Sequence, residues 1–134
     1  MKTKTKKNGS VLLMVVFTIA LLTAFVVGML EMNYEQIQIM RNEIFAAQAL
    51  AIAEGGLADA FARIRTSSAL PGNFSGSLSG GGSYNVTIAG SLPDPNITST
   101  GTSPQGYQAR VQADITVGTT GTYIIRVDKL GINE

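Results

Sequence analysis

The sequence lacks three residue types that often carry protein chemistry. Its 134 residues include no cysteine, no histidine and no tryptophan. Without cysteine there is no disulfide and no thiolate nucleophile, and without histidine the commonest general base and metal ligand is missing. The acids Asp94, Asp114 and Asp128 are not spaced as a metal site or a catalytic pair. We therefore expect a protein that is not an enzyme and that holds no cofactor and no metal.

Charge is also scarce, and it is unevenly placed. Lysine and arginine number 10 and the acids 9, which gives a net charge of +1. Lys2, Lys4, Lys6 and Lys7 all lie in a basic leader, residues 1–9, and the rest of the chain carries a net charge of −3. The slightly basic isoelectric point is a property of this leader, so it gives no reason to expect nucleic-acid binding.

Residues 10–30 contain no charge and no proline, and read SVLLMVVFTIALLTAFVVGML. At helical rise this run is ~32 Å long, enough to cross the hydrocarbon core of a bilayer. Lysines before it and Glu31 after it predict a single membrane-spanning helix with a cytoplasmic N-terminus. A secretory signal peptide also begins with basic residues. However, this run is longer than an ordinary signal core, and VVGMLEMN offers no small-x-small cleavage site.

Residues 31–65 predict an amphipathic helix that continues the span. Their apolar residues recur at spacings of three and four: Ile37, Met40, Ile44, Ala47, Leu50, Ala53, Leu57, Phe61 (or Ala60) and Ile64. The joined helix is about 55 residues and ~80 Å long, so part of it must lie in lipid or pack against copies of itself. Gly55 and Gly56 interrupt the pattern. They predict a hinge, a close approach to the sheet, or simply a tolerated irregularity.

Residues 66–83 are dominated by serine and glycine and predict a flexible connection. The glycines at 80–82 are not a phosphate-binding loop, because no Lys-Ser or Lys-Thr pair follows them. From residue 84 to 134 the apolar period changes to two, which predicts a β-sheet domain. The expected strands are 84–88, a shorter 96–100, 109–117 and 123–128, with a turn at Pro93 and Pro95 and a hairpin at Gly118–Gly121.

A helix followed by a strand meander indicates an α+β fold with an antiparallel sheet. Leu57, Phe61 and Ile64 are the predicted cover of its apolar face. Its exposed face holds the four charged residues that we expect in cross-strand ion pairs: Arg110, Asp114, Arg126 and Asp128.

The N-terminus resembles that of a type IV pilin or type II secretion pseudopilin. The likeness lies in KKNG followed by SVLLMVVFTIALLTAFVV, and AAQALAIAEGGLADAFARIR is similar to the Ala-rich helix of PilX-type minor pilins. The resemblance implies a long N-terminal membrane helix packed on a small antiparallel sheet. It also implies cleavage by prepilin peptidase between Gly9 and Ser10, and methylation of Ser10. The implied partners are other pilin subunits, bound through the helix, and an inner-membrane assembly platform. The implied location is the bacterial cytoplasmic membrane, then an extracytoplasmic filament.

One position departs from the family pattern. Most members carry glutamate as the fifth mature residue, where it pairs with the terminal amine of a neighbouring subunit, but this chain has Met14. A subunit without that acid resembles the K-type minor pseudopilin at the filament tip, although the large extra domain of that type is not evident here. We expect a minor pilin or pseudopilin. The alternative is a single-pass anchor that presents a β-rich binding module outside the cell.

Overall fold

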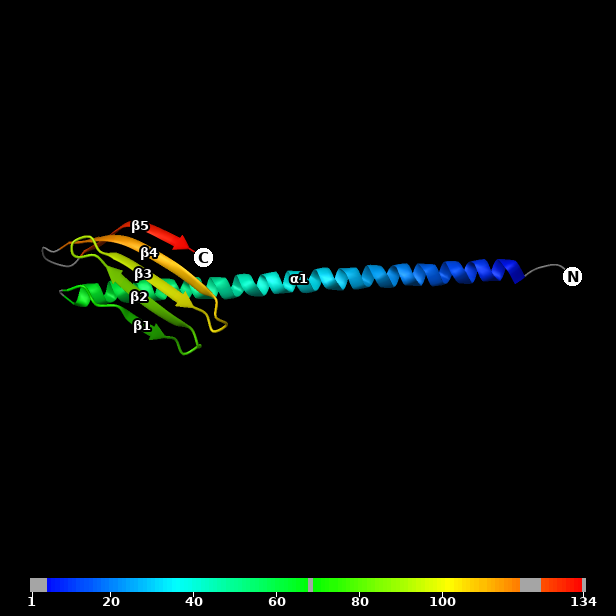
Figure 1. Cartoon of the computed structure of the whole chain (residues 1–134), viewed down its shortest axis with the longest axis horizontal. Coiled ribbons are helices and arrows are strands. Elements are labelled where there is room, and N and C mark those ends of the chain that lie inside the picture. The colour runs from blue at the N-terminus through cyan, green and yellow to red at the C-terminus, as the bar shows by residue number, and fades with distance from the viewer. Residues whose placement is uncertain (1–4, 68, 119–123, 134) are drawn as a thin grey trace. The chain divides into compact units, whose positions relative to one another are not determined.

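The computed structural model describes residues 5–67, 69–118 and 124–133. It contains one helix, α1 (Thr5–Thr66), followed by five strands (Figure 1). The strands are β1 (Phe74–Ser77), β2 (Ser83–Ala89), β3 (Asn96–Thr102), β4 (Gln108–Val117) and β5 (Ile125–Asn133). The chain divides into two units, Met1–Arg41 and Asn42–Glu134. The predicted α+β class is confirmed.

The first unit is the N-terminal part of α1. The helix begins at Thr5, before the start of the predicted span. No proline interrupts it, and from residue 9 to residue 41 every residue is exposed except Gly28, which is half-exposed. This helix is long and apolar enough to cross a membrane. Its apolar residues are therefore those of a helix that needs lipid or a partner around it.

The second unit is built on an antiparallel meander. The five strands lie in the order β1-β2-β3-β4-β5, and each pairs antiparallel with the next along the chain. Both β2 and β4 fall where the period-two pattern predicts strands. By contrast, β3 is longer than the predicted strand 96–100 and lies at the centre of the sheet.

The prediction of a wholly flexible connection at residues 66–83 is wrong in part. Phe74–Ser77 forms β1 and pairs with Val86–Ser83 of β2. Serine and glycine have little intrinsic preference for strands, so the residues alone gave no period-two signal. Backbone hydrogen bonding to an existing strand is what makes this segment extended.

The predicted hairpin at Gly118–Gly121 lies mostly outside the described residues, as does Tyr123, the first residue of the last predicted strand. What the structure does show is that the Gly118 amide donates to the carbonyl of Ile124 at 2.9 Å. Beyond this contact β5 runs from Ile125 to Asn133, past the predicted end at residue 128.

The core lies between α1 and one face of the sheet. The helix contributes buried residues from its C-terminal part: Ala49, Ala53, Leu57, Ala60 and Ile64. The strands contribute Val86, Ile97, Ala109, Val111, Ala113, Ile115 and Val117. Of the three predicted covering residues, Leu57 and Ile64 are buried and Phe61 is half-buried at the edge of the cluster.

Helix and sheet approach each other very closely at two glycines. A Cβ atom on Gly101 of β3 would lie 2.2 Å from the carbonyl oxygen of Ala49 and 2.4 Å from the amide nitrogen of Ala53. On the helix, a Cβ on Gly56 would lie 2.5 Å from Ser99 Oγ. The helix continues through Gly55 and Gly56 without a break. Of the three interpretations, close approach is therefore the one found at Gly56.

Candidate functional site

The first candidate site is the junction between the leader and the apolar run. Gly9 and Ser10 are both exposed on α1. A Cβ added to Gly9 would have no atom within 4 Å among its non-neighbours. Glycine inside a helix costs about 1 kcal/mol relative to alanine. Packing within this chain therefore does not require the glycine, and the helix is locally weakened by it.

Met14 and the hydroxyls of the span lie on the same exposed helix. Met14 is 71% exposed. Thr18 Oγ1 donates to the Met14 carbonyl at 2.8 Å, and Thr23 Oγ1 donates to the Ile19 carbonyl at 2.8 Å. Both hydroxyls are thus satisfied within the helix, as a hydrocarbon environment demands of polar groups.

Exposed apolar residues continue along α1 beyond the predicted span. Ile37 is 50% exposed and Ile44 is 52% exposed, although both belong to the predicted amphipathic stripe. The other large exposed apolar residues here are Met32, Tyr34, Ile39 and Met40. The stripe loses its exposure only where the sheet covers it: Ala53, Leu57 and Ile64 are buried, and Leu50 and Phe61 are half-buried. A surface of this kind on a helix is typical of an interaction with a membrane or a protein partner.

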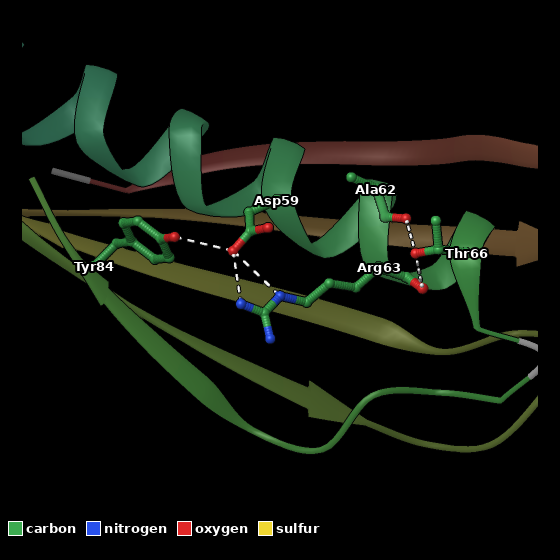
Figure 2. Close-up of polar contacts among 5 residues, drawn as sticks. All are labelled: Asp59, Ala62, Arg63, Thr66 and Tyr84. Carbon is green, nitrogen blue, oxygen red and sulfur yellow. Dashed lines mark hydrogen bonds and ion pairs between the residues drawn. The ribbon is translucent and has the colours of Figure 1, made fainter.

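A polar cluster fastens the opposite end of α1 to the sheet, as Figure 2 shows. The Tyr84 hydroxyl donates to Asp59 Oδ2 at 2.9 Å, and Arg63 Nε donates to the same oxygen at 3.3 Å. The Arg63 guanidinium also stacks over the ring of Phe74, 4.0 Å from its centroid. These contacts join the helix to β1 and β2 at their exposed edge. The Asp59–Arg63 pair has the i, i+4 spacing of a helix, whereas its contacts with Tyr84 and Phe74 join residues far apart in the chain and were not evident from the sequence.

The charges of this cluster shift two pKa values. The hydrogen bond from Arg63 and then that from Tyr84 hold the pKa of Asp59 below its ordinary value. The same bond to Asp59 raises the pKa of the Tyr84 phenol above its ordinary value. The cluster therefore favours ionised Asp59 and neutral Tyr84. The contacts from Arg63 and Tyr84 converge on Asp59 Oδ2 and tie the helix to the sheet, so the geometry is that of a structural clasp.

A second clasp joins the β3–β4 turn to α1. The Tyr107 hydroxyl donates to Asn42 Oδ1 at 2.6 Å, and the Tyr107 ring lies 5.6 Å from that of Phe45. The Tyr107 amide donates to Ser103 Oγ at 3.1 Å, which holds the turn in shape. These contacts fix the first turn of the helix within the second unit.

The outward face of the sheet is neutral and hydrophilic over β1 to β3. Strand pairing places Ser77, Ser83 and Thr102 in one row across the sheet, and Ser75, Asn85 and Thr100 in the next. A shallow groove of about 600 Å³ runs over these rows. Its lining is hydroxyl, amide and backbone, so it offers hydrogen bonds but no charge to a ligand.

The three acids whose spacing predicted no metal site lie beyond this groove: Asp114 is on β4, Asp128 on β5, and Asp94 in the connection between β2 and β3. Thr116 Oγ1 lies 3.0 Å from Asp94 Oδ1 and 2.6 Å from Asp128 Oδ2, so its single proton serves one of the two carboxylates. Asn96 Nδ2 donates to Asp114 Oδ1. Within the described residues no group of three or more metal-ligating side chains comes together.

The prediction of cross-strand ion pairs on this face is wrong in its partners. Arg126 Nε lies 3.1 Å from Asp128 Oδ1, but both residues belong to β5. Asp114 lies opposite Lys129 in the register and bonds to Asn96 instead of an arginine. In the described part of the chain Arg110 forms no ion pair. The charge pattern identified the face but could not give the register.

Comparison of this chain with protein-family models, with curated proteins and with solved structures gives no match. The functional argument therefore rests on the residues and geometry described above. Gly9, Ser10 and Met14 lie along one exposed helix, while the clasps and the sheet belong to the second unit.

Proposed function

We propose that this chain is a minor pilin or pseudopilin, a structural subunit of a type IV pilus or type II secretion filament. Prepilin peptidase cuts it after Gly9, and Ser10 becomes the methylated N-terminus. The protein then works by packing: its exposed apolar helix lies among the helices of other subunits, and its sheet unit is carried outside the membrane.

The observation that carries the proposal is the position of Gly9, between the leader lysines and the uncharged, exposed helical run. Among the described residues no atom lies within 4 Å of its Cβ position, which is also true of Gly28 and Gly55, so packing neither requires nor singles out this glycine. A peptidase that requires glycine before the cut gives a reason for a glycine at this boundary. The surrounding features support the same function, because lysines precede the glycine and an uncharged, exposed helical run follows it.

Met14 fits a position at or near the tip of such a filament. A subunit that begins a filament has no earlier terminal amine to pair with, so it does not need an acid at its fifth mature residue. Its own terminal amine at Ser10 still receives the glutamate of the next subunit. The exposed stripe through Ile37 and Ile44 supports helix-to-helix packing by the same chain.

The test is the intact mass of the full chain extracted from bacterial membranes with and without a prepilin peptidase. We expect the peptidase to remove residues 1–9 and to leave one methyl group on Ser10. Gly9→Val should block the cut. Gly28→Val is the matched control, since Gly28 also has no atom near its Cβ position, and it should be processed normally. An intact Met1 in cells that possess the peptidase would falsify the proposal.

The neutral groove on the outward sheet face favours one alternative, a single-pass anchor that presents a binding module. Such an anchor shares the membrane span but needs neither cleavage nor assembly. Gly9→Val separates the two functions. The anchor should retain its location and behaviour with the substitution, whereas the pilin should accumulate as an unprocessed, unassembled precursor.

A further inference from the structure

The last strand of the sheet leaves large apolar side chains uncovered. Val127 is 47% exposed, Leu130 56% and Ile132 53%. They lie on the core side of the sheet, because the register places them opposite Ile115, Ala113 and Val111, which are buried. The period of two in the predicted strand 123–128 puts Val127 on the apolar face expected to be covered, but α1 lies over the middle of the sheet and does not reach this edge (Figure 1).

The backbone of the same strand has one unused side. β5 pairs with β4 and with no other described strand, and it is nine residues long. The opposite edge, β1, is only four residues long and carries one large apolar residue, Phe74, which is half-buried. Long apolar edges are templates for pairing with another chain, whereas very short edges are protected.

The residues of β5 complement a reversed copy of themselves. When two β5 strands run antiparallel about an axis between residues 128 and 129, Ile125 lies opposite Ile132 and Val127 lies opposite Leu130. Across the same axis Asp128 of each copy lies opposite Lys129 of the other. Apolar residues therefore meet apolar residues and each acid meets a base, which are the favourable cross-strand pairs.

The bulge in β5 fits this pairing and no simple alternative. Lys129 pairs with Asp114 and Val127 with Ile115, so Asp128 is an extra residue relative to β4. Against an ordinary strand, this extra residue would shift one side of the register and move apolar residues to the wrong face. Against a second β5, each copy supplies the same extra residue between Val127 and Leu130, so both faces stay matched.

We propose that β5 is a homotypic docking edge through which two copies of this chain pair antiparallel. The pairing joins two five-stranded sheets into one, covers Val127, Leu130 and Ile132 of both copies, and satisfies the unused backbone groups. It is an isologous contact, because the same surface serves both partners. It does not depend on cleavage at Gly9 and holds equally for a pilin or an anchor.

The symmetry also sets the relative direction of the two sheet units. The axis of an antiparallel strand pair is perpendicular to the sheet, so the Asn42–Thr66 segments of the two copies, which lie across the sheet, run in opposite directions.

Disulfide cross-linking tests the register, since the natural chain has no cysteine. The full chain is prepared in detergent with single substitutions. Residues 126 and 131 lie opposite each other in the pair, whereas residue 126 lies about 16 Å from its own equivalent. A mixture of Arg126→Cys and Gly131→Cys chains should cross-link at least ten times more than either chain alone. Lys129→Cys should cross-link to itself, because its two equivalents are about 6 Å apart, within disulfide range.

A second measurement follows the monomer–dimer equilibrium in detergent by sedimentation. Leu130→Asp should weaken dimerisation at least tenfold. Leu78→Asp is the control, because Leu78 is 46% exposed and directly follows β1, the strand at the opposite edge of the sheet. Dimerisation unchanged by Leu130→Asp assigns the contact to α1 and overturns the proposal. So does a mixture of Arg126→Cys and Gly131→Cys chains that cross-links no better than its components.

Discussion

At the scale of single residues, two adjacent glycines occupy opposite environments. Gly56 faces β2 and β3, and a Cβ there would lie 2.5 Å from Ser99 Oγ and 2.9 Å from the Tyr84 ring. Gly55 faces away, with no such atom within 4 Å. Packing therefore requires glycine at residue 56 but not at residue 55. Substituting each in turn compares the effect of a steric clash with the effect of helix propensity.

We expect Gly56→Ala and Gly55→Ala to change stability in opposite directions. Gly56→Ala forces Ser99 and Tyr84 to move, and overpacking of this kind costs roughly 1–3 kcal/mol. Gly55→Ala removes the backbone freedom of an exposed helix position and should stabilise by up to about 1 kcal/mol. Urea unfolding of the full chain in detergent measures both. Equal effects of the two substitutions would show that the helix does not approach the sheet at Gly56.

The clasp at Asp59 gives stability a dependence on pH. The pKa of Asp59 is lowered in the folded protein, chiefly by Arg63, so the folded state binds its proton less tightly than the unfolded state. This contribution is fully present above the unfolded pKa, near 3.8, and is lost as pH falls through the lower folded pKa. A variant without the Asp59 carboxylate therefore does not lose this part of its stability on acidification.

We therefore expect Asp59→Asn to destabilise the protein at pH 7 by about 1 kcal/mol, the cost of an exposed ion pair and one hydrogen bond. The difference from the natural chain should shrink as pH falls below about 4, because protonation removes the same interactions. Unfolding midpoints at pH 3 and pH 7 test this. Glu54→Gln is the control, since it removes an exposed carboxylate from the same helix. A difference that grows on acidification would contradict the assignment.

At the scale of elements, α1 changes character along its length. Its N-terminal residues are exposed and apolar, and from Ala49 to Ile64 one face is buried under the sheet. Ile44 and Ile64 belong to the same predicted stripe, yet Ile64 is 1% exposed and Ile44 is 52% exposed. Periodicity gives the orientation of a helix face, whereas the position of the sheet decides which part of that face is covered.

Truncating these two isoleucines should separate core packing from the uncovered stripe. Ile64→Ala removes buried methyl groups from the centre of the core and should cost about 2–5 kcal/mol. Ile44→Ala should change the stability of the isolated protein by less than about 0.5 kcal/mol. Thermal unfolding of the two variants in detergent provides the comparison. A large loss from Ile44→Ala would mean that the detergent-solubilised chain already buries this stripe in an oligomer.

Much of this fold was predictable from local patterns, and the failures have physical causes. The helix and the strands β2 and β4 follow from periods of three to four and of two in apolar residues. β1 was missed because Ser75, Gly76 and Ser77 have no strand preference of their own and are extended by pairing with β2. The uncovered edge at Val127 was missed because alternation gives a face but not the width of the helix that covers it. The glycine at residue 9 was visible from sequence, and the structure adds that no atom of the described residues packs at its Cβ position, as is also true of Gly28 and Gly55.

At the scale of the whole molecule, charge and hydropathy are segregated along the chain. Four lysines lie before residue 10, the exposed apolar run follows, and the remainder is net acidic. Because basic flanks remain on the cytoplasmic side, this asymmetry predicts that the sheet unit is on the opposite side of the membrane. The outward face of the sheet, which is neutral over β1 to β3, would then contact the extracytoplasmic solvent.

Labelling of introduced cysteines tests this orientation, and no native residue of the chain is labelled because the natural sequence has no thiol. The full chain is produced in cells that lack prepilin peptidase, so that the leader is retained. Asn85→Cys, on the exposed face of β2, should react with a membrane-impermeant maleimide in intact spheroplasts. Thr5→Cys should react only after the membrane is permeabilised. Replacing the four leader lysines with glutamine should reduce the difference in labelling between Asn85→Cys and Thr5→Cys in intact spheroplasts, since the positive flank fixes the direction of insertion. Labelling of Thr5→Cys in intact spheroplasts would place the leader outside, which excludes a cytoplasmic cut after Gly9.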